Sequence, residues 1–369
     1  MLTCPPAQVS CMGHRGALDN ERGEYVVIVP TLNEERAIEA CLSSLLAQVS
    51  PDCEVLVVDG GSTDQTAAIV AGLQVRHGNL RFFHNPKKLQ AAAINQAARI
   101  ADARAKYLIR ADAHCVYPPT FIADCIRALK QTGATSVVVP MLAVGDTRRQ
   151  RAIAAAQRSI LGNGGATHRS VGVSGFVDHG HHAAFERTFF MAQGGYDENL
   201  SHYEDVDFDH RTLQNGGRIW MCAEAAVSYL PRRTFRALAR QYFNYGRGRA
   251  LTALRGGPAL KPRHLMLPAI LPTLLGSSAL TAVHPGFFII LAAYVLLCTV
   301  WSLCAAIRSR DMALLAMGFA AMVMQISWAS GFAAGCLATP HRLAGSSRTK
   351  QSIIPEPAVA ERKEQGQAV

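Results

Sequence analysis

Strand and helix patterns alternate along the first 145 residues, and this alternation constrains the fold more than any other feature of the sequence. The apolar run Tyr25–Pro30 has the β-branched character of a strand buried on both faces, and a helical pattern over Glu34–Gln48, with Asn33 as its N-cap, follows it. Further strands are expected at Glu54–Val58, Leu80–His84, Tyr107–Arg110 and Ser136–Val139, alternating with helices over Gln65–Leu73, Leu89–Ala105 and Pro119–Thr132. This order predicts a doubly wound α/β domain with functional residues at the carboxyl ends of its strands.

The part of this domain that follows residue 145 has a weaker pattern. An irregular, Gly-rich stretch over Leu161–Gly180 precedes a helical segment at Glu204–Asn215. Loop-rich segments of this kind often complete an active site. The α/β domain is therefore expected over residues 25–231, after a flexible leader over residues 1–24.

Three apolar segments near the C-terminal end predict a membrane region over residues 264–339. They are Leu265–Val283, Phe287–Ile307 and Ala313–Thr339, each close to the roughly 20 residues that cross a bilayer. The first contains Pro268 and Pro272 and is either a span or a re-entrant or interfacial segment. Two to three transmembrane helices are expected, followed by a polar tail over residues 340–369 on an undecided side.

The net charge of +10 is concentrated just before the apolar segments. No acidic residue occurs between Glu224 and Asp311, whereas residues 232–263 are rich in arginine. Apolar residues from Phe235 to Phe243 follow a helical period with arginines opposite, which predicts an amphipathic helix at an anionic membrane surface rather than a nucleic-acid site. A core helix is the alternative. Ten scattered cysteines without a CxxC pair favour a reduced chain that faces the cytoplasm.

Candidate donor-site residues follow two of the predicted strands. Asp59 ends one strand and precedes a Gly-Gly turn, so its carboxylate is placed to accept hydrogen bonds from a nucleobase or ribose, although Asp and Gly also form ordinary turns. Asp112 and His114 follow another strand at the same sheet edge and form a possible site for Mn²⁺ or Mg²⁺ bound to a diphosphate. The alternative makes Asp112 a helix cap and His114 a turn residue.

Three further groups of polar residues are candidates for binding or catalysis. Lys87 and Lys88 would complement phosphate charge, unless they are solvated surface lysines. The cluster from Asp178 to His182 favours acceptor contacts over a zinc site, because adjacent histidines seldom converge on one ion. Glu204 and Asp205 begin a helix, where they are either dipole partners or a source of the base that activates an acceptor hydroxyl.

Together these motifs resemble the inverting glycosyltransferases of family 2, which have the GT-A fold. The resemblance covers roughly residues 25–250 and rests on VVIVPTLNEE, VVDGGSTDQT, NPKKLQAAAINQA, IRADAH, GGYDENLSHYEDVDFDHR and QYFNYGRGR, in the family's order. Within that family the chain is most similar to the succinoglycan-type bacterial exopolysaccharide glucosyltransferases, through ADAH, VDHGHH and YGRGR. His114 replaces the second Asp of a common DxD motif, and the segment Gln241–Tyr245 replaces the QxxRW motif of processive synthases.

The resemblance implies a role for each matched residue. Pro30, Glu34 and Asp59 would contact the nucleoside, Asp112 and His114 the metal and diphosphate, and Asp205 would be the base. The residues expected at each part of the site are, for catalysis, Asp205 and Glu204; for the donor, Pro30, Glu34, Asp59, Lys87, Lys88, Asp112, Arg247 and Arg249; for the metal, Asp112 and His114; for the acceptor, Asp178, His179 and His182.

The resemblance also implies the substrates and the setting of the enzyme. It implies a UDP-glucose donor, a polyprenyl-diphosphate-linked glycan acceptor and other exopolysaccharide assembly proteins as partners. From the charge pattern, membrane lipid is a further expected partner and nucleic acid is not. The expected location is the bacterial inner membrane with the catalytic domain in the cytoplasm. Two alternatives remain, namely a polyprenyl-phosphate glycosyltransferase and a non-catalytic membrane sensor of nucleotide sugars.

Overall fold

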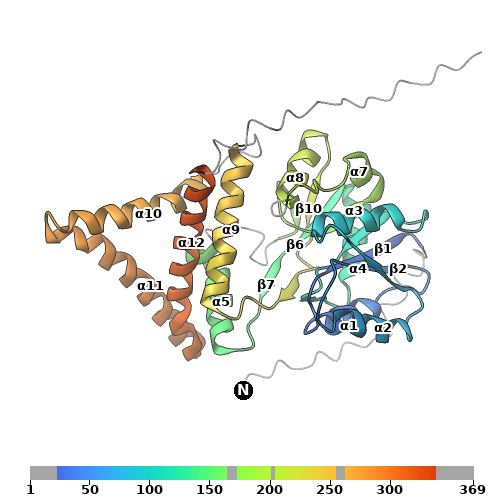
Figure 1. The fold of residues 1–369 in the computed structure, drawn as a ribbon, viewed down its shortest axis with the longest axis horizontal. Coiled ribbons are helices and arrows are strands. Elements are labelled where there is room, and N and C mark those ends of the chain that lie inside the picture. The colour runs from blue at the N-terminus through green and yellow to red at the C-terminus, as the bar shows by residue number, and fades with distance from the viewer. Residues whose placement is uncertain (1–22, 164–172, 201–203, 255–261, 338–369) are drawn as a thin grey trace, which may run out of the picture.

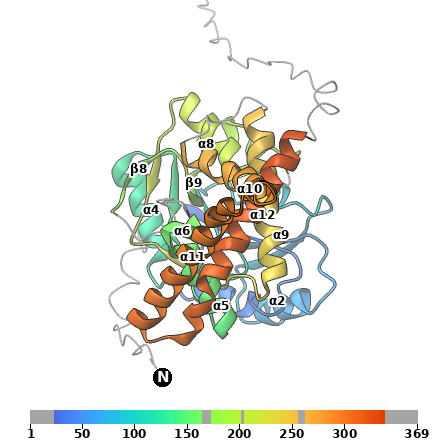
Figure 2. The same cartoon turned by 90° about the vertical axis from the view of Figure 1, so that its left-hand side faces the viewer.

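The computed structural model describes residues 23–163, 173–200, 204–254 and 262–337, which form two parts (Figure 1). One part is an α/β domain around a large sheet. The other consists of long helices, of which α9 (Phe235–Leu254) and α12 (Met317–Leu337) lie side by side in both views (Figure 2). The predicted tail, and the predicted leader except for its last two residues, lie outside the described residues.

Eight strands form the large sheet in the order β3-β2-β1-β4-β9-β6-β10-β8. The first four along the chain, β1 (Tyr25–Thr31), β2 (Glu54–Asp59), β3 (Leu80–His84) and β4 (Tyr107–Arg110), are parallel to their neighbours among themselves. β1 continues one residue past its predicted end at Pro30. Because pairing with β4 ends at Ile28 and Arg110, the missing Pro30 N–H removes no bond from that ladder.

The antiparallel strand β9 (His181–Glu186) lies between β4 and β6 (Ser136–Val139) and makes the sheet mixed. The sequence predicts no strand here, because HHAAFE contains no β-branched residue. β10 (Ile219–Met221) and β8 (Gly175–Val177) complete the sheet. A doubly wound beginning is thus closed by strands that run in both directions.

Helices cover both faces of this sheet and divide its core into two layers. Alternate residues of β1 point to opposite faces, so Val27 and Val29 join one apolar cluster while Val26 and Ile28 join the other. The helices α1 (Ile38–Leu46), α2 (Thr66–Gln74) and α4 (Phe121–Thr132) contribute to the first cluster. The helices α3 (Gln90–Ile100), α7 (Arg187–Ala192) and α8 (Glu204–Gln214) contribute to the second.

Two predicted helix boundaries are wrong for identifiable reasons. The helix expected from Glu34 begins at Ile38, because Asn33 has a positive φ of 56° and its side-chain oxygen accepts a bond from Thr63 N (2.8 Å) instead of capping α1. The helix expected to reach Ala105 ends at Ile100. The Arg187 guanidinium donates to the carbonyls of residues 101, 102 and 105, and thereby satisfies the end of α3.

The irregular region predicted after residue 145 contains regular elements. Its helices are α5 (Arg148–Arg158), which has a capping box at Thr147, and the short α6 (Ile160–Asn163). A second, three-stranded sheet is formed by β5 (Cys115–Val116), β11 (Val227–Tyr229) and β7 (Met141–Ala143). Strands of two or three residues are too short to produce a recognisable period in the sequence.

The predicted amphipathic helix is α9, and its apolar face packs on protein. Leu238 and Tyr242 join a cluster with α5 and α12, the arrangement that the sequence analysis placed second. Its position at a membrane surface stays a prediction. In the described residues, Pro285–Ser309 and Met312–Leu337 are long and apolar enough to cross a membrane. These ranges comprise η4 (Pro285–Phe287) with α11 (Phe288–Ser309), and η5 (Met312–Ala316) with α12.

The helix α10 (Pro262–Leu280) corresponds to the first predicted span. It contains Pro268 and Pro272 and has a shorter apolar part, Met266–Leu280. In Figure 1, α10 and α11 form an arm that extends away from α9, and the two helices meet at the tip of this arm.

Candidate active site

Two loops at the carboxyl ends of β1 and β2 meet at the edge of the sheet where the sequence analysis expects the donor, and we name this edge the donor edge. Asp59, at the end of β2, is only 4% exposed. Its Oδ2 accepts bonds from the N–H groups of Gly61 and Ser62, each at 2.8 Å, and its Oδ1 accepts from Ser62 Oγ (2.5 Å) and Thr31 Oγ1 (3.2 Å). Gly61 has a φ of 85°, which suits glycine. Asp59 therefore fixes the shape of this edge and joins it to β1.

The next residues bring a third strand end to the same edge. Glu34 donates its N–H to Thr66 Oγ1 (2.8 Å), and its Oε1 lies 3.5 Å from His114 Nδ1 in the loop after β4. Lys88 has a φ of 55° and its backbone lies against the Gly60 turn. Lys87 instead pairs with Glu198 at 2.5 Å. Of the two lysines, Lys88 is the one beside the Asp59 loop.

Arg110, the last residue of β4, joins the donor edge to the predicted base. Its side chain is 3% exposed. The guanidinium donates from Nη1 to Asp205 Oδ1 (2.5 Å) and the Tyr196 hydroxyl (2.9 Å), and from Nε to Asp112 Oδ1 (3.3 Å). One buried cation thus holds two carboxylates that are far apart in the sequence. A planar guanidinium suits this role because it offers several donors in a fixed geometry.

A histidine of β9 extends this network to a further carboxylate. His182 is fully buried, with Nε2 2.7 Å from Asp209 Oδ1 and Nδ1 2.6 Å from Tyr196 OH. Asp209, one turn after Asp205 on α8, also lies 2.6 Å from His179 Nδ1 through its Oδ2. Burial opposes charging of His182, but Asp209 and Asp205 outweigh it and raise its pKa to about 9. We name Asp112, Arg110, Asp205, His182 and Asp209 the charged network.

Packing around Tyr196 keeps the charged network in place. Asn95 of α3 donates to Tyr196 O (2.8 Å) and accepts from Tyr196 N (2.9 Å). Gly195 has a φ of 68°, and a Cβ there would lie 2.3 Å from Asn95 Oδ1, so this turn requires glycine. The rings of Phe185 and Phe208 pack against Tyr196 and His182. The GGYDE motif therefore positions the tyrosine that links Arg110 with His182.

The two acids at the start of α8 have opposite protonation properties. Burial alone would raise the pKa of Asp205, but Arg110 and His182 outweigh it and hold that pKa well below its usual value. Burial, followed by repulsion from Asp205, raises the pKa of Glu204 to about 7. The Asp205 side chain is 21% exposed, whereas Glu204 is 9% exposed as a whole residue. Asp205 is therefore the more accessible and the more strongly ionised of the two.

Asp112 and two histidines supply donors of the kind that Mn²⁺ or Mg²⁺ uses. Asp112 Oδ2 lies 3.5 Å from His181 Nε2, while its Oδ1 accepts from Gln90 Nε2 (2.9 Å). Burial lowers the pKa of His181 to about 4, which keeps the imidazole neutral as a metal ligand must be. Among the described residues, no group of three or more His, Cys, Asp or Glu side chains already converges as a metal site. Asp112 and His181 are donors that suit a divalent ion. His114 lies two residues after Asp112, in the loop that follows β4.

Comparison with known proteins identifies the family. The family model for Glycosyl transferase family 2 matches residues 26–193. The chain is 38% identical over 310 residues to the succinoglycan biosynthesis protein ExoA of Rhizobium meliloti (strain 1021), covering 83% of this chain and 93% of the relative. The chain belongs to glycosyltransferase family 2. The predicted resemblance is confirmed.

Two other similarities agree with this family 2 assignment. A dolichyl N-acetyl-α-D-glucosaminyl phosphate 3-β-D-2,3-diacetamido-2,3-dideoxy-β-D-glucuronosyltransferase from Methanococcus voltae is 23% identical over 62% of this chain and 74% of its own length. The solved mannosyltransferase PcManGT from Pyrobaculum calidifontis, in complex with GDP-Man and Mn²⁺, matches with a TM-score of 0.53 at 22% identity, over 83% of this chain and 87% of that chain. The α/β domain of this family 2 enzyme therefore has the GT-A fold, as predicted.

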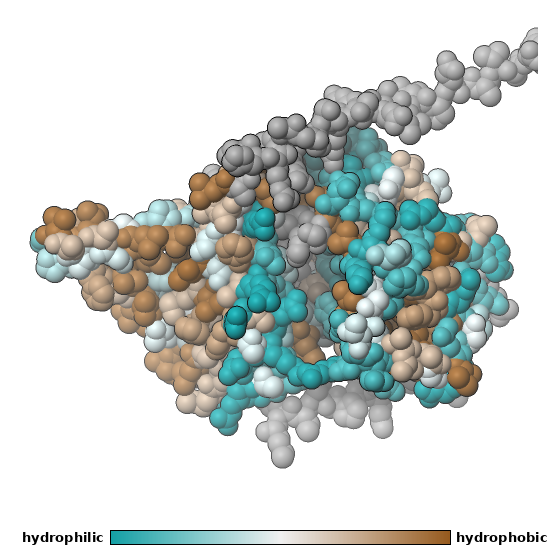
Figure 3. Space-filling model, in the orientation of Figure 1, coloured by the Kyte–Doolittle hydropathy of each residue, from teal (hydrophilic) through white to brown (hydrophobic). Residues whose placement is uncertain are grey.

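The remaining predicted residues lie at different distances from the charged network. Asp178 is exposed beside His179, whereas His182 is buried and contacts Asp209 instead of presenting a surface to an acceptor. Arg247 and Arg249 are on α9, in the helical part, with Arg247 exposed and Arg249 7% exposed. In Figure 3 the surface is hollowed between α9 and the α/β domain.

Sequence reasoning did not select four residues that the structure brings into contact with Asp112, Asp205 or His182, namely Arg110, His181, Tyr196 and Asp209. Arg110 was assigned only to a strand, although an arginine that ends an apolar strand has to find a buried anion. His181 was passed over because alternation along β9 cannot be recognised without the strand itself. Asp209 follows Asp205 at i+4, which places both carboxylates on one side of α8.

Proposed function

We propose that this family 2 enzyme transfers glucose from UDP-glucose to a polyprenyl-diphosphate-linked oligosaccharide during exopolysaccharide assembly, with inversion at the anomeric carbon. The observation that supports the proposal is that one buried cation, Arg110, bonds both Asp112 and Asp205. We assign Asp112 to the donor site and Asp205 as the base. The name of the Rhizobium relative, a succinoglycan biosynthesis protein, supports the pathway.

Asp205 is the proposed base. Its carboxylate takes the proton of the acceptor hydroxyl while that oxygen forms a bond to the anomeric carbon, and the bond from this carbon to the diphosphate oxygen breaks. The leaving nucleoside diphosphate departs on the opposite face, so the configuration inverts. The partial exposure of Asp205 supports this role, because an acceptor hydroxyl has to reach its oxygen.

The proposed donor site uses groups at the carboxyl ends of three strands. Pro30, Glu34 and Asp59 would contact the nucleoside, and Lys88 and Arg110 would offset diphosphate charge. Asp112 and His181, together with His114, would hold a divalent ion, which when bound neutralises charge on the diphosphate. Arg247 and Arg249 of α9 are proposed to complete the leaving-group side.

The proposed acceptor is a lipid-linked sugar at the inner membrane, and the catalytic domain faces the cytoplasm. The apolar ranges Pro285–Ser309 and Met312–Leu337 support membrane association. The Methanococcus relative is named for transfer to a dolichyl phosphate-linked sugar, which supports an acceptor of this class. Asp178 and His179 are proposed to contact this acceptor, and other exopolysaccharide assembly proteins are proposed partners.

A transfer assay tests the proposal directly. Membranes that contain the chain would be incubated with a panel of radiolabelled nucleotide sugars and a lipid-linked acceptor extract, and the lipid product would be identified by mass. We expect label from UDP-glucose in an extended polyprenyl-diphosphate glycan, and none with Asp205→Asn. A polyprenyl monophosphate sugar as the product would instead support the polyprenyl-phosphate transferase. Absence of transfer with every donor would favour the non-catalytic sensor.

A further inference from the structure

The helices α11 and α12 are similar in length and apolar composition but have different surroundings. Both are long and strongly apolar, yet 11% of the most apolar stretch of the first range is buried, against 50% of the second. On α11 the buried residues are Cys298, Ser302 and Ala306, which repeat every four positions and face the beginning of α12. The rest of α11 presents apolar side chains outward (Figure 3).

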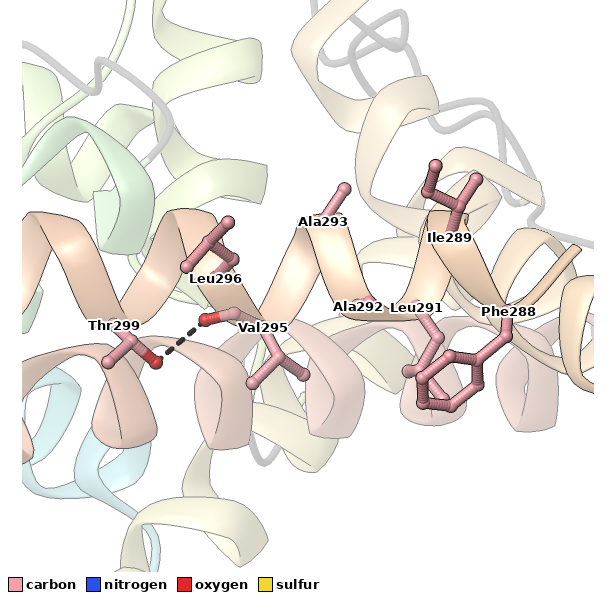
Figure 4. A pocket seen from close by; sticks show the side chains of 8 residues that line it. All are labelled: Phe288, Ile289, Leu291, Ala292, Ala293, Val295, Leu296 and Thr299. Carbon is pink, nitrogen blue, oxygen red and sulfur yellow. Dashed lines mark hydrogen bonds between the residues drawn. The ribbon is translucent and has the colours of Figure 1, made fainter. Parts of the chain in front are cut away.

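From Phe288 to Thr299, the outward side of α11 is apolar. Eight of its residues line an open apolar hollow: Phe288, Ile289, Leu291, Ala292, Ala293, Val295, Leu296 and Thr299 (Figure 4). The hydroxyl of Thr299, the polar side chain among them, donates to Val295 O at 2.8 Å, so it needs no water partner. A helix surface with every polar group satisfied internally is suited to hydrocarbon.

Charge is confined to the two ends of the arm formed by α10 and α11. No Asp, Glu, Lys or Arg occurs between residues 264 and 307, and the turn at the tip carries only His284 as a titratable group. Arg308 lies in the last turn of α11 and Arg310 directly follows that helix, whereas Arg263 lies at the start of α10. Both ends of the arm are therefore basic, as expected for segments that enter and leave a membrane on its cytoplasmic side.

In contrast, one side of α12 packs against α9 and α5. Its contacts with α9 are close: a Cβ at Gly246 would lie 1.9 Å from Trp328 O, and one at Gly331 would lie 1.9 Å from Phe243 O. Arg151 of α5 pairs with Asp311, just before η5, at 3.0 Å. The large side chains left exposed in the body of α12 are Phe319 and Ile326, seven residues apart on one narrow stripe.

The partner α9 is not compatible with a hydrocarbon environment. Arg236, Arg240 and Arg247 are exposed along it, and the surface over α9 in Figure 3 is a hydrophilic strip. If α12 crossed a bilayer with these glycine contacts intact, α9 would carry several arginines into the membrane, and each is costly there. The contacts with α9 therefore keep α12 out of the hydrocarbon.

We infer that the arm of α10 and α11 is the element that enters the bilayer, and that α12 lies on the same side as the catalytic domain. The inference rests on the proposed membrane association and corrects its topology, since α12 is then no transmembrane helix despite its composition. The chain after Leu337 is consequently on the cytoplasmic side. The arm of α10 and α11 enters the bilayer and returns to the same side, and it thereby holds the site close to the lipid-linked acceptor.

Cysteine accessibility tests the side on which α12 ends. In a full-length chain with Cys4, Cys11 and Cys304 replaced by serine, native Cys336 is an exposed reporter at the end of α12. Val75→Cys, at an 87% exposed position of the α/β domain, is the matched reporter in a chain that also lacks Cys336, and Ser352→Cys is a second reporter beyond α12. Each would be labelled with a membrane-impermeant maleimide in right-side-out and inside-out vesicles.

We expect all three reporters to be labelled in inside-out vesicles only. The inference would be overturned if residue 336 or residue 352 were labelled from the side of the membrane opposite to residue 75. It would also be overturned if neither of these two residues were labelled in either kind of vesicle. Release of the chain from membranes by alkaline carbonate would instead show that membrane association itself fails. Transfer activity is measured in the same vesicles, so a failure of the proposed reaction is recorded separately from a failure of the topology.

A pair of arginine substitutions gives a second test. Leu296→Arg on α11 is expected to reduce the membrane-bound fraction at least several-fold, because residue 296 is 63% exposed on the arm. Ile326→Arg, on the exposed stripe of α12, is expected to leave that fraction unchanged. Equal losses from the two substitutions would overturn the inference.

Discussion

The donor edge and the charged network are two halves of one site that are stabilised differently. At the donor edge, Asp59 uses its oxygens to fix the backbone of its own turn. In the charged network, Arg110 joins side chains from the loop after β4, from α8 and from the GGYDE turn. Loss of one bond at the donor edge leaves a local turn less ordered, whereas loss of one member of the network leaves a buried charge without its partner.

The largest expected effect is that of removing the base from the charged network. Asp205→Asn keeps the shape of the side chain but removes its negative charge, and we expect transfer to fall by roughly 10²–10⁴-fold while UDP-glucose still binds. Initial rates and a donor-binding isotherm would measure the two quantities. The matched control is Asp207→Asn on the same helix, which pairs with Arg211 and should retain its rate. A fully active Asp205→Asn would remove the base from the proposal.

A smaller loss is expected when the cation of the network keeps its charge but loses its geometry. Arg110→Lys cannot reach Asp112, Asp205 and Tyr196 together, so we expect a loss of about 10²-fold in kcat/KM, of the order found when a transition-state contact is removed. Arg104→Lys, at an exposed residue that pairs with Asp102, is the control. If both variants retain wild-type kinetics, Arg110 is not a bridge between the two halves.

At the donor edge a substitution should affect binding more than turnover. Asp59→Ala leaves the N–H groups of Gly61 and Ser62 without their acceptor and should raise the KM for donor about tenfold, the equivalent of roughly 1.4 kcal/mol. Steady-state kinetics at varied UDP-glucose would separate KM from kcat. Asp52→Ala, at an exposed surface position, serves as the control. A drop in kcat with unchanged KM would contradict the separation of the halves.

The smallest expected effect concerns pH and distinguishes the two acids of α8. Glu204 has a pKa raised to about 7, so the folded state keeps a proton that the unfolded chain releases near pH 4.5. The cost of ionising Glu204 is absent below pH 4.5 and complete above pH 7, so stability falls as pH rises between these values. Glu204→Gln removes the cost and should raise the melting temperature at pH 8 by roughly 3–6 °C.

The same variant also tests which acid is the base. We expect Glu204→Gln to retain transfer and to lose any inflection in rate near pH 7. If Glu204→Gln abolishes transfer while Asp205→Asn remains active, the roles of the two acids are reversed. At pH 5 the wild-type protein and Glu204→Gln should have nearly the same melting temperature, because Glu204 is protonated in the folded wild-type protein at that pH.

The sequence supported the donor edge well because its signals are local. Asp59 and its Gly-Gly turn follow a strand whose pattern is unambiguous. The charged network depends on contacts across long separations, such as Arg110 with Asp205, 95 residues apart. The sequence identified Asp205 and His182 as polar candidates but gave no sign that Arg110 joins them, because β9 and the turn before Tyr196 have no periodic pattern.

The two apolar helices α11 and α12 also differ through contacts that their own composition does not reveal. Hydropathy alone predicts α11 and α12 as equivalent, and the difference between them comes from Gly246 and Gly331, which permit α9 to approach. A glycine inside a helix is ambiguous in sequence, because it indicates either weak helix propensity or a close contact with a partner. Only the neighbouring backbone distinguishes these cases.

The central position of β9 has a consequence for synthesis of the chain. β4 and β6 emerge from the ribosome well before the strand that has to lie between them, so the sheet waits with two open edges until residue 186 is available. Arg110 can pair with Asp205 only after residue 205 has been synthesised, which is later still. Nascent chains released between these points would expose both strand edges and an unneutralised arginine, which makes this interval the one at which chaperones and proteases would distinguish a complete enzyme from an unfinished one.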